Sequence, residues 1–356
     1  MTKTIKKIGI VGEGKMGSNL FYYLLNFDFF IRLKCSSGAD IEKIRKNFLR
    51  KITRSRDAGI LSDNTFDKIK TRTVISTENE ILTDCDLIIE AIPEKIDLKR
   101  AFFKTIDGVL NEECIIASNS SSINPGRLIP SLKRSPLFLG LHFFYPIPLI
   151  NIVEIIVPGS FYNPAIQTLT AFLDKIDRKY ILLDETNSFV LNRIFLDFQN
   201  ESFLMVKNGH ITIGQLDALA RKYFFPMGVF EFIDSVGIDT MLNSIKNYVE
   251  NYPHKDYYSS LINHLGTMVQ KGVLGQKSGN GFYQYPGGVI SERNTELDPG
   301  SDPEGKIAEH LRSVYLSSVR RFTSQSKLSI PEMNETIKEY FCIKKGPFDL
   351  DIPGDH

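Results

Sequence analysis

The stretch GIVGEGKMGSNL, from Gly9 to Leu20, decides the fold of the first half of the chain. It places Gly12, Gly14 and Gly17 in the spacing G-x-G-x-x-G, between an apolar segment and a segment with helical periodicity. Glycines in this pattern allow a tight turn and close approach of the backbone to a pyrophosphate at the helix N-terminus. The stretch therefore predicts a dinucleotide-binding turn, and a glycine-rich connection without a ligand is the alternative.

The next predicted strand departs from the usual dinucleotide-binding pattern. In such domains a carboxylate at the end of this strand accepts the ribose hydroxyls. Here the segment is FFIRLKCSS, Phe29 to Ser37, and it contains no acid. It offers basic and hydroxyl side chains that would suit the 2′-phosphate of NADP, namely Arg32, Lys34, Ser36 and Ser37. For a nicotinamide dinucleotide, the sequence therefore leaves NAD and NADP both open.

Short apolar segments alternate with amphipathic ones over the first half of the chain. The apolar segments are IGIVG, FFIRL, TRTVIS, DLIIEAI, CIIASN, LFLGLHFF and KYILLD. Several are apolar on both faces, which is typical of parallel strands covered by helices. The pattern predicts an α/β Rossmann-type, doubly wound sheet over residues 1–186, with its ligand crevice at the carboxyl ends of the strands.

The second half is predicted to be helical. Residues 187–290 should form an all-α domain, and residues 291–356 a linker and a truncated second helical repeat. ITIGQLDALARKYFFPMGVFEFID resembles LSIPEMNETIKEYFCIKKGPFDLD near the end of the chain, and the shared order of features favours duplication over chance. In the repeat, an apolar stripe should pack against the helix that contains Asn192 to Val206. The stripe consists of Leu311, Val314, Tyr315, Val319 and Phe322.

The composition argues against several classes of protein. A formal net charge of +1 gives no overall attraction to nucleic acid or to an anionic membrane. No apolar run approaches the roughly 20 residues of a membrane span. Four cysteines without a C-x-x-C pair, and histidines without metal-ligand spacing, argue against a disulfide framework or a metal site. The first predicted strand follows the amino terminus without room for a signal peptide, so we expect a soluble, cytoplasmic protein.

Several polar side chains follow predicted strands. His142 ends one strand and Glu154 lies on the next, where a carboxylate would fix the imidazole tautomer and stabilise the imidazolium. A histidine packed among aromatic residues is the alternative. The segment SNSSSI, Ser118 to Ile123, would open into the same crevice, although hydroxyls at strand ends are also common turn formers. Asn192 lies near the start of the long helix, at the surface or in the cleft.

A basic run extends from Lys43 to Arg56 and includes Arg54. Such a run is usually a solvated helix face. Beside a nucleotide-binding cleft it could instead hold the phosphates of a long substrate.

Taken together, these segments resemble the L-3-hydroxyacyl-CoA dehydrogenase family. The resemblance covers about the first 285 residues, through GIVGEGKMG, LIIEAIPEKIDLK, ASNSSSI, GLHFFYP, VEII, LNRI, PMGVFEFID and GQKSGNGFYQY. The terminal repeat is similar to the second helical unit of multifunctional fatty-acid-oxidation proteins, cut short. The resemblance implies β-oxidation chemistry, the interconversion of (3S)-3-hydroxyacyl-CoA and 3-ketoacyl-CoA with NAD as cofactor.

The resemblance also implies roles for individual residues. His142 would be the catalytic base and Glu154 its partner acid, while Ser121 and Asn192 would hold the substrate oxygen. Arg54 is a candidate for contact with the CoA part of such a substrate because of the basic run in which it lies, and not because of the resemblance. The implied cofactor contacts are Gly12, Gly14, Lys15, Met16, Gly17, Cys35, Ser36, Glu94, Lys99, Tyr145 and Lys277.

The sequence departs from the family pattern at two of these positions. Cys35 replaces the ribose-binding Asp, and Tyr145 replaces an Asn beside the nicotinamide. Because the four catalytic groups survive, an active enzyme is favoured over a non-catalytic dinucleotide-binding or scaffold protein. A related hydroxy-acid dehydrogenase that does not use CoA is the closer alternative. Single-repeat members pair through their helical domains and a second repeat can take the partner's place, so we expect a monomer or a homodimer.

Overall fold

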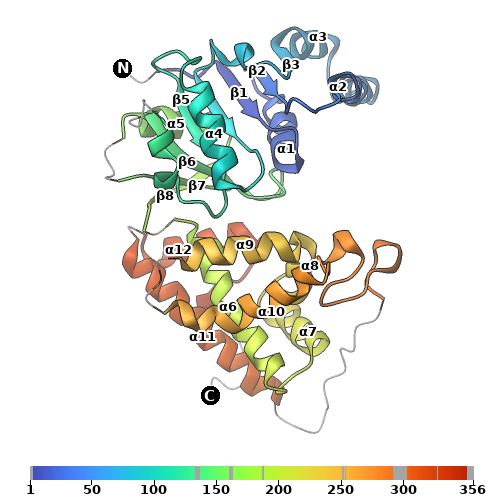
Figure 1. Ribbon diagram of the computed structural model, residues 1–356, viewed down its shortest axis with the longest axis vertical. Coiled ribbons are helices and arrows are strands. Elements are labelled where there is room, and N and C mark those ends of the chain that lie inside the picture. The colour runs from blue at the N-terminus through green and yellow to red at the C-terminus, as the bar shows by residue number, and fades with distance from the viewer. Residues whose placement is uncertain are drawn as a thin grey trace. The chain divides into compact units, whose positions relative to one another are not determined.

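The computed structural model describes residues 3–132, 137–159, 163–186, 188–250, 252, 254–291, 303–326 and 328–350. The chain divides into two compact units, Met1–Ser188 and Phe189–His356 (Figure 1). The division lies next to the boundary proposed from the sequence. In the described parts of the chain, no helix is long and apolar enough to cross a membrane. The same residues contain no group of three or more His, Cys, Asp or Glu that could hold a metal ion.

The first unit is built on the predicted Rossmann-type sheet, which the structure confirms. Its strands lie in the order β3-β2-β1-β4-β5-β6-β7-β8, and the neighbours are parallel except for the antiparallel pair β6–β7. The strands are β1 (Lys7–Val11), β2 (Phe30–Lys34), β3 (Thr73–Ser76), β4 (Leu87–Glu90), β5 (Ile115–Ser118), β6 (Phe138–Phe143), β7 (Ile152–Val157) and β8 (Lys179–Asp184).

Helices cover this sheet and bury both of its faces. They are α1 (Lys15–Leu24), α2 (Ile41–Asp57), α3 (Asp63–Arg72), α4 (Ile96–Ile106) and α5 (Ala165–Lys175). Successive residues of a strand point to opposite faces, so Ile88 and Ile89 of β4 belong to different cores. Ile88 packs in a cluster with Phe103 of α4, whereas Ile89 packs in a cluster with Phe21 of α1. This burial on both faces explains why the strands are apolar throughout.

The second unit is helical, as predicted. Its helices are α6 (Val190–Lys207), α7 (Ile213–Tyr223), α8 (Val229–Val236), α9 (Ile238–Val249), α10 (Ser259–Gln270), α11 (Pro303–Gln325) and α12 (Ile330–Phe341). Short 3₁₀ turns lie between some of them, and another follows α12 at Pro347–Asp349.

The proposed internal repeat has matching local geometry in its two copies. Helices α7 and α12 both begin with a capping box, formed by Thr212 with Gln215 and by Ser329 with Glu332. Further along, the side chain of Asp217 accepts a hydrogen bond from the backbone N–H of Phe230. Asn334 accepts one from the backbone N–H of Phe348 in the same way. Since these positions correspond in the two sequence copies, the geometry supports duplication.

The apolar stripe of the second copy packs as predicted. Helix α11 lies along α6, and Leu311, Tyr315, Val319 and Phe322 are each at most 1% exposed, whereas Val314 is half-buried. A buried polar group joins the same two helices. The carboxylate of Asp197 in α6 accepts hydrogen bonds from Ser318 and Arg321 of α11 and from Tyr258. Apolar packing and an ion pair between the buried Asp197 and the half-exposed Arg321 therefore both attach the second repeat to its unit.

Candidate active site

The glycine-rich turn has the geometry of a pyrophosphate cradle. Gly12 has a φ of +110°, and a Cβ there would lie 2.6 Å from the carbonyl oxygen of Ala91. A Cβ on Gly17 would lie 2.0 Å from the carbonyl oxygen of Gly12, so both positions require glycine. Gly14 faces open space, and as the N-cap of α1 it supplies no capping side chain. The N-terminal end of α1 therefore presents its backbone N–H groups to an open space. This arrangement fits the pyrophosphate of a dinucleotide.

At the end of β2, Cys35, Ser36 and Arg32 are engaged within the protein. The thiol of Cys35 is fully buried in the core, and this burial raises its pKa to about 11. Ser36 is not free to bind a phosphate, because its backbone N–H and its hydroxyl both donate to the carboxylate of Glu13, at 3.0 and 2.5 Å. Arg32 donates to the carbonyl oxygen of Arg72. Glu13, an acid of the glycine-rich turn that the sequence had not indicated as a cofactor contact, thus lies at this strand end.

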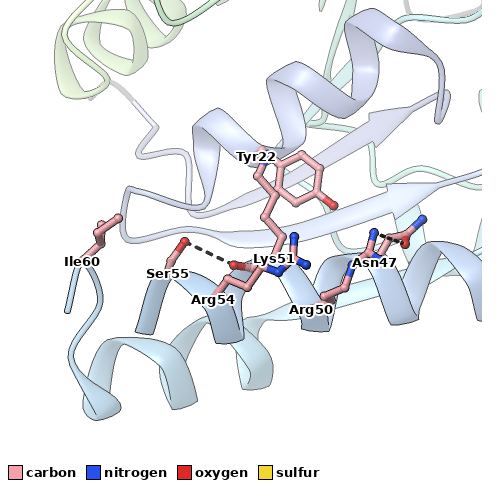
Figure 2. A pocket seen from close by; sticks show the side chains of 7 residues that line it. All are labelled: Tyr22, Asn47, Arg50, Lys51, Arg54, Ser55 and Ile60. Carbon is pink, nitrogen blue, oxygen red and sulfur yellow. Dashed lines mark hydrogen bonds between the residues drawn. The ribbon is translucent and has the colours of Figure 1, made fainter. Parts of the chain in front are cut away.

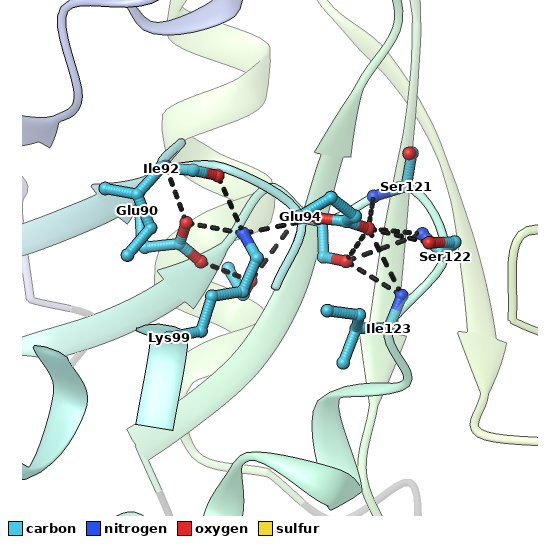
Figure 3. A network of polar contacts seen from close by, with 9 residues as sticks. Glu90, Ile92, Glu94, Lys99, Ser121, Ser122 and Ile123 are labelled. Atoms are coloured by element: carbon cyan, nitrogen blue, oxygen red, sulfur yellow. Dashed lines mark hydrogen bonds and ion pairs between the residues drawn. The ribbon is translucent and has the colours of Figure 1, made fainter. Parts of the chain in front are cut away.

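Glu94 and Lys99 belong to one polar network, in which Lys99 is buried and Glu94 half-buried (Figure 3). Lys99 is 1% exposed, and its Nζ donates to Glu90 at 2.6 Å and to the Ile92 carbonyl at 3.2 Å, and lies 3.4 Å from Glu94. Glu90 in turn accepts a hydrogen bond from Ser118 at the end of β5. The ammonium group is therefore surrounded by protein oxygens.

One oxygen of Glu94 organises the turn that follows β5. It accepts hydrogen bonds from the backbone N–H groups of Ser121, Ser122 and Ile123 at 2.9–3.3 Å, and from the hydroxyls of Ser120 and Ser122. Burial alone would raise the pKa of Glu94, but Lys99 and the hydrogen bonds from the serines hold it below its usual value. Glu94 is thus an ionised anchor for the turn that carries Ser121.

The Ser121 turn is also linked to the strand that carries His142. Figure 3 shows the Ser121 hydroxyl pointing away from Glu94, on the side opposite the network. Asn119, two residues earlier, accepts a hydrogen bond from the backbone N–H of Phe143 at 2.9 Å. Since β5 and β6 are parallel neighbours, this contact holds the turn beside the carboxyl end of β6.

His142 and Glu154 form the predicted pair. They are opposite each other in the antiparallel register of β6 and β7, and His142 Nδ1 lies 2.8 Å from Glu154 Oε2. Both side chains are buried, at 4% and 0% exposed, and the imidazole also contacts the ring of Phe144 with centroids 4.3 Å apart. A buried carboxylate on Nδ1 orients the ring and stabilises its charged form, so the pair has the parts of an acid–base catalyst.

Four other predicted cofactor residues lie near the glycine turn or further along the chain. Lys15 Nζ lies 4.1 Å from the centroid of the Tyr145 ring, which is 45% exposed. Met16 is half-buried against the core under α1. Lys277 belongs to the second unit, where its Nζ lies 2.5 Å from Asp239 Oδ1. The structure therefore brings Lys15 and Tyr145 together, and it describes Lys277 with a partner of its own unit.

Asn192 lies in the first turn of α6, between two tyrosines of the second unit. Its Nδ2 donates to the hydroxyl oxygen of Tyr248 at 3.0 Å, and its Oδ1 accepts from the hydroxyl of Tyr340 at 2.9 Å. Tyr340 belongs to α12, in the second helical repeat. The repeat therefore reaches a residue proposed for catalysis, a contact that no local pattern in the sequence indicates.

The basic run on α2 lines a cavity of about 490 Å³ together with α1 (Figure 2). Arg50, Lys51 and Arg54 contribute three cations, and Lys51 Nζ lies 3.6 Å from the centroid of the Tyr22 ring. The remaining lining residues are Asn47, Ser55 and Ile60. The three cations are exposed on α2, and together with the aromatic ring and the polar groups they give this hollow the charge that a nucleotide phosphate would require.

The chain is similar to known proteins over both units. The 3-hydroxyacyl-CoA dehydrogenase NAD-binding domain matches residues 7–186, and the C-terminal domain of the same family matches residues 189–285. The 3-hydroxybutyryl-CoA dehydrogenase of Bradyrhizobium diazoefficiens is 30% identical over 288 residues, which are 81% of this chain and 98% of that protein.

Two further relatives differ in how much of this chain they match. The fatty acid oxidation complex subunit alpha of Psychrobacter cryohalolentis is 28% identical over 344 residues, which are 94% of this chain and 46% of that protein. The crystal structure of (S)-3-hydroxybutyryl-CoA dehydrogenase PaaH1 from Ralstonia eutropha has a TM-score of 0.71 and 28% identity. It covers 80% of this chain and 100% of its own. The chain belongs to the 3-hydroxyacyl-CoA dehydrogenase family.

Proposed function

We propose that this protein interconverts (3S)-3-hydroxyacyl-CoA and 3-ketoacyl-CoA with a nicotinamide dinucleotide. The observation that carries the proposal is the buried His142–Glu154 pair, 2.8 Å apart, in a fold whose glycine-rich turn fits a pyrophosphate. The basic cavity on α2 favours a CoA ester over a small hydroxy acid. The nicotinamide dinucleotide is either NAD or NADP.

The protein side chains would move a proton and hold an oxygen. In the oxidation direction His142 accepts the proton of the 3-hydroxyl, and in reduction it returns a proton to the new hydroxyl. Glu154 stabilises the imidazolium, which is the form of His142 that carries the transferred proton. Ser121 would donate a hydrogen bond to the substrate oxygen, a role that the family resemblance also gives to Asn192. The bound nicotinamide supplies the hydride chemistry at C3.

We assign Glu94 and Lys99 a positioning role instead of direct contact with the cofactor. Lys99 has three protein oxygens around its ammonium group, and one Glu94 oxygen holds five groups of the turn that carries Ser121. Their effect on the reaction would therefore pass through the placement of Ser121.

The reaction is tested by adding a short 3-ketoacyl-CoA to the purified protein with NADH or NADPH and following oxidation of the cofactor by absorbance. A panel of acyl chain lengths and the matching keto acids without CoA completes the test. Turnover of the CoA ester supports the proposal, and turnover of the free acid alone indicates the related hydroxy-acid dehydrogenase. Absence of turnover with every substrate contradicts the proposal and indicates a non-catalytic relative.

The Arg54→Gln variant is expected to raise the KM for acyl-CoA about 10-fold with little change in kcat. A hydrogen bond to a charged group contributes about 1.5–3 kcal/mol to binding. Because Arg54 would contact a CoA phosphate and not the reacting carbon, it would stabilise substrate and transition state equally. Steady-state kinetics with acyl-CoA and with the acyl-pantetheine, which lacks the nucleotide phosphates, measure the effect.

The acyl-pantetheine should show no difference between Arg54→Gln and the wild type. Lys46→Gln is the matched control, because Lys46 lies on the same helix and is exposed outside the lining of the cavity. An equal rise in KM for both substrates, or for both variants, would show that the cavity does not bind the CoA phosphates.

The Tyr340→Phe variant is expected to lower kcat/KM about 2- to 10-fold, with cofactor binding unchanged. It removes the hydroxyl that holds the Asn192 amide but keeps the aromatic packing, and a neutral hydrogen bond contributes about 0.5–1.5 kcal/mol. If the effect passes through Asn192, Tyr340→Phe should cause no further loss in an Asn192→Ala background. A full additional loss in that background would show that Tyr340 acts independently of Asn192.

A further inference from the structure

The carboxylate of Glu13 lies where a dinucleotide-binding fold normally holds the adenosine ribose. Glu13 is the residue between the first two glycines of the turn, and the backbone N–H of Gly12 donates to the carbonyl of Lys34 at the end of β2. The two oxygens of Glu13 accept the hydroxyl and the backbone N–H of Ser36, two residues after that strand. In the usual arrangement this position is taken by an acid from the strand itself.

The Glu13 carboxylate is ionised and can be reached by a ligand. It is half-buried, and although burial would raise its pKa, the two hydrogen bonds from Ser36 and the charge of Lys34 lower it. A carboxylate can accept about four hydrogen bonds, so it keeps acceptor capacity beside the contacts with Ser36 and with its own backbone N–H. A ribose hydroxyl would use this capacity.

Two arginines near the strand end are turned to other partners, and the charge of Lys34, the last residue of β2, acts on Glu13. Arg32 donates to the carbonyl of Arg72, and Arg45 donates to the carbonyl of Ile75 and to Glu42. The Ser36 hydroxyl donates to Glu13. A 2′-phosphate at this strand end would therefore meet a carboxylate, while these donors would first have to leave their present partners.

We propose that Glu13 selects the cofactor: its carboxylate binds the 2′- and 3′-hydroxyls of NAD and repels the 2′-phosphate of NADP. The turn thereby supplies the acid that β2 lacks at Cys35. This inference rests on the proposed function only in requiring that the turn bind a nicotinamide dinucleotide, and it makes NAD the cofactor of the reaction.

The test is direct binding of NADH and NADPH, followed by the fluorescence of the reduced nicotinamide, in the absence of any acyl substrate. The wild type should bind NADH more tightly than NADPH. In Glu13→Gln the ratio of the two dissociation constants should change about 10- to 100-fold in favour of NADPH, because hydrogen bonds to a charged acceptor are lost together with the repulsion.

Two further variants separate this role from a structural one. Ser36→Ala removes the hydroxyl partner but keeps the Glu13 carboxylate, so the ratio should change much less than in Glu13→Gln. Glu42→Gln removes a nearby negative charge that pairs with Arg45, and should leave the ratio close to the wild-type value. If Glu13 only held the turn, Ser36→Ala would reproduce the effect of Glu13→Gln.

The outcomes separate this inference from the proposed function. An unchanged ratio in Glu13→Gln, or a wild type that prefers NADPH, overturns the inference while leaving a dinucleotide-dependent dehydrogenase intact. A wild type that binds neither nucleotide overturns both.

Discussion

Replacing His142 by Gln is expected to lower kcat by about 10²- to 10⁴-fold, which is the usual contribution of a positioned general base. The glutamine can fill the buried site, but it cannot accept the proton of the 3-hydroxyl. Because the side chain lies in a strand and contacts Glu154 rather than the glycine-rich turn, NADH binding should be preserved. Steady-state turnover of a 3-ketoacyl-CoA, with NADH binding measured on the same preparation, provides the test.

Glu154→Gln is the matched variant, because it keeps the size of the side chain and removes its charge. It should also lower kcat strongly, since an amide cannot stabilise the imidazolium as a carboxylate does. The double variant should be little worse than His142→Gln alone, because residues that act as a unit are not additive. A kcat near the wild-type value in His142→Gln would contradict the assignment of the general base.

The sequence predicts the fold and the candidate site best where both depend on the pattern of apolar strands. Segments that are apolar on both faces could be recognised as covered strands, and the structure places a strand in each of them. His142 and Glu154 could be paired because they occupy successive strands, and the antiparallel register places them directly opposite each other. That register could not be derived from periodicity, which is the same for parallel and antiparallel neighbours.

Residues that act through tertiary contacts were not predicted. Glu13 was visible in the glycine motif, but the destination of its side chain depends on the fold of the turn against Ser36. The resemblance places Lys99 at the cofactor, and its network with the carboxylates of Glu90 and Glu94 becomes visible only from the packing of α4. Likewise, the contact between Tyr340 and Asn192 joins residues 148 positions apart. No local signal could indicate it.

The second helical repeat is expected to be required for the stability of the helical unit. Ending the chain at Ser291 would remove α11 and α12 and expose the face of α6 against which they pack. Phe195 and Phe198 would lose their contacts with Phe341 and Tyr315, whose ring centroids lie 5.1 and 5.8 Å away. Several hundred Å² of apolar surface would become exposed, an area typical of interaction sites. The shortened chain should therefore dimerise or aggregate, which light scattering would detect.

The buried charge on α6 makes the loss larger than apolar contacts alone would. Asp197, with a side chain 7% exposed, would keep Tyr258 but lose Ser318 and Arg321. Truncation exposes this carboxylate together with the face of α6, and each lost hydrogen bond adds about 0.5–1.5 kcal/mol to the loss of apolar packing. Urea unfolding of the shortened chain should therefore have a much lower midpoint than that of the full chain.

A pair of substitutions on α11 tests the same prediction in the full-length protein. Val319→Asp places a charge on the buried face of the helix and should destabilise the second unit by about 3–5 kcal/mol. Ser317→Asp places the same charge on the exposed face and should have little effect. If the shortened chain is monomeric and as stable and active as the full chain, and Val319→Asp behaves like Ser317→Asp, then the repeat is an appendage. The helical unit would then fold, and Asn192 would act, without it.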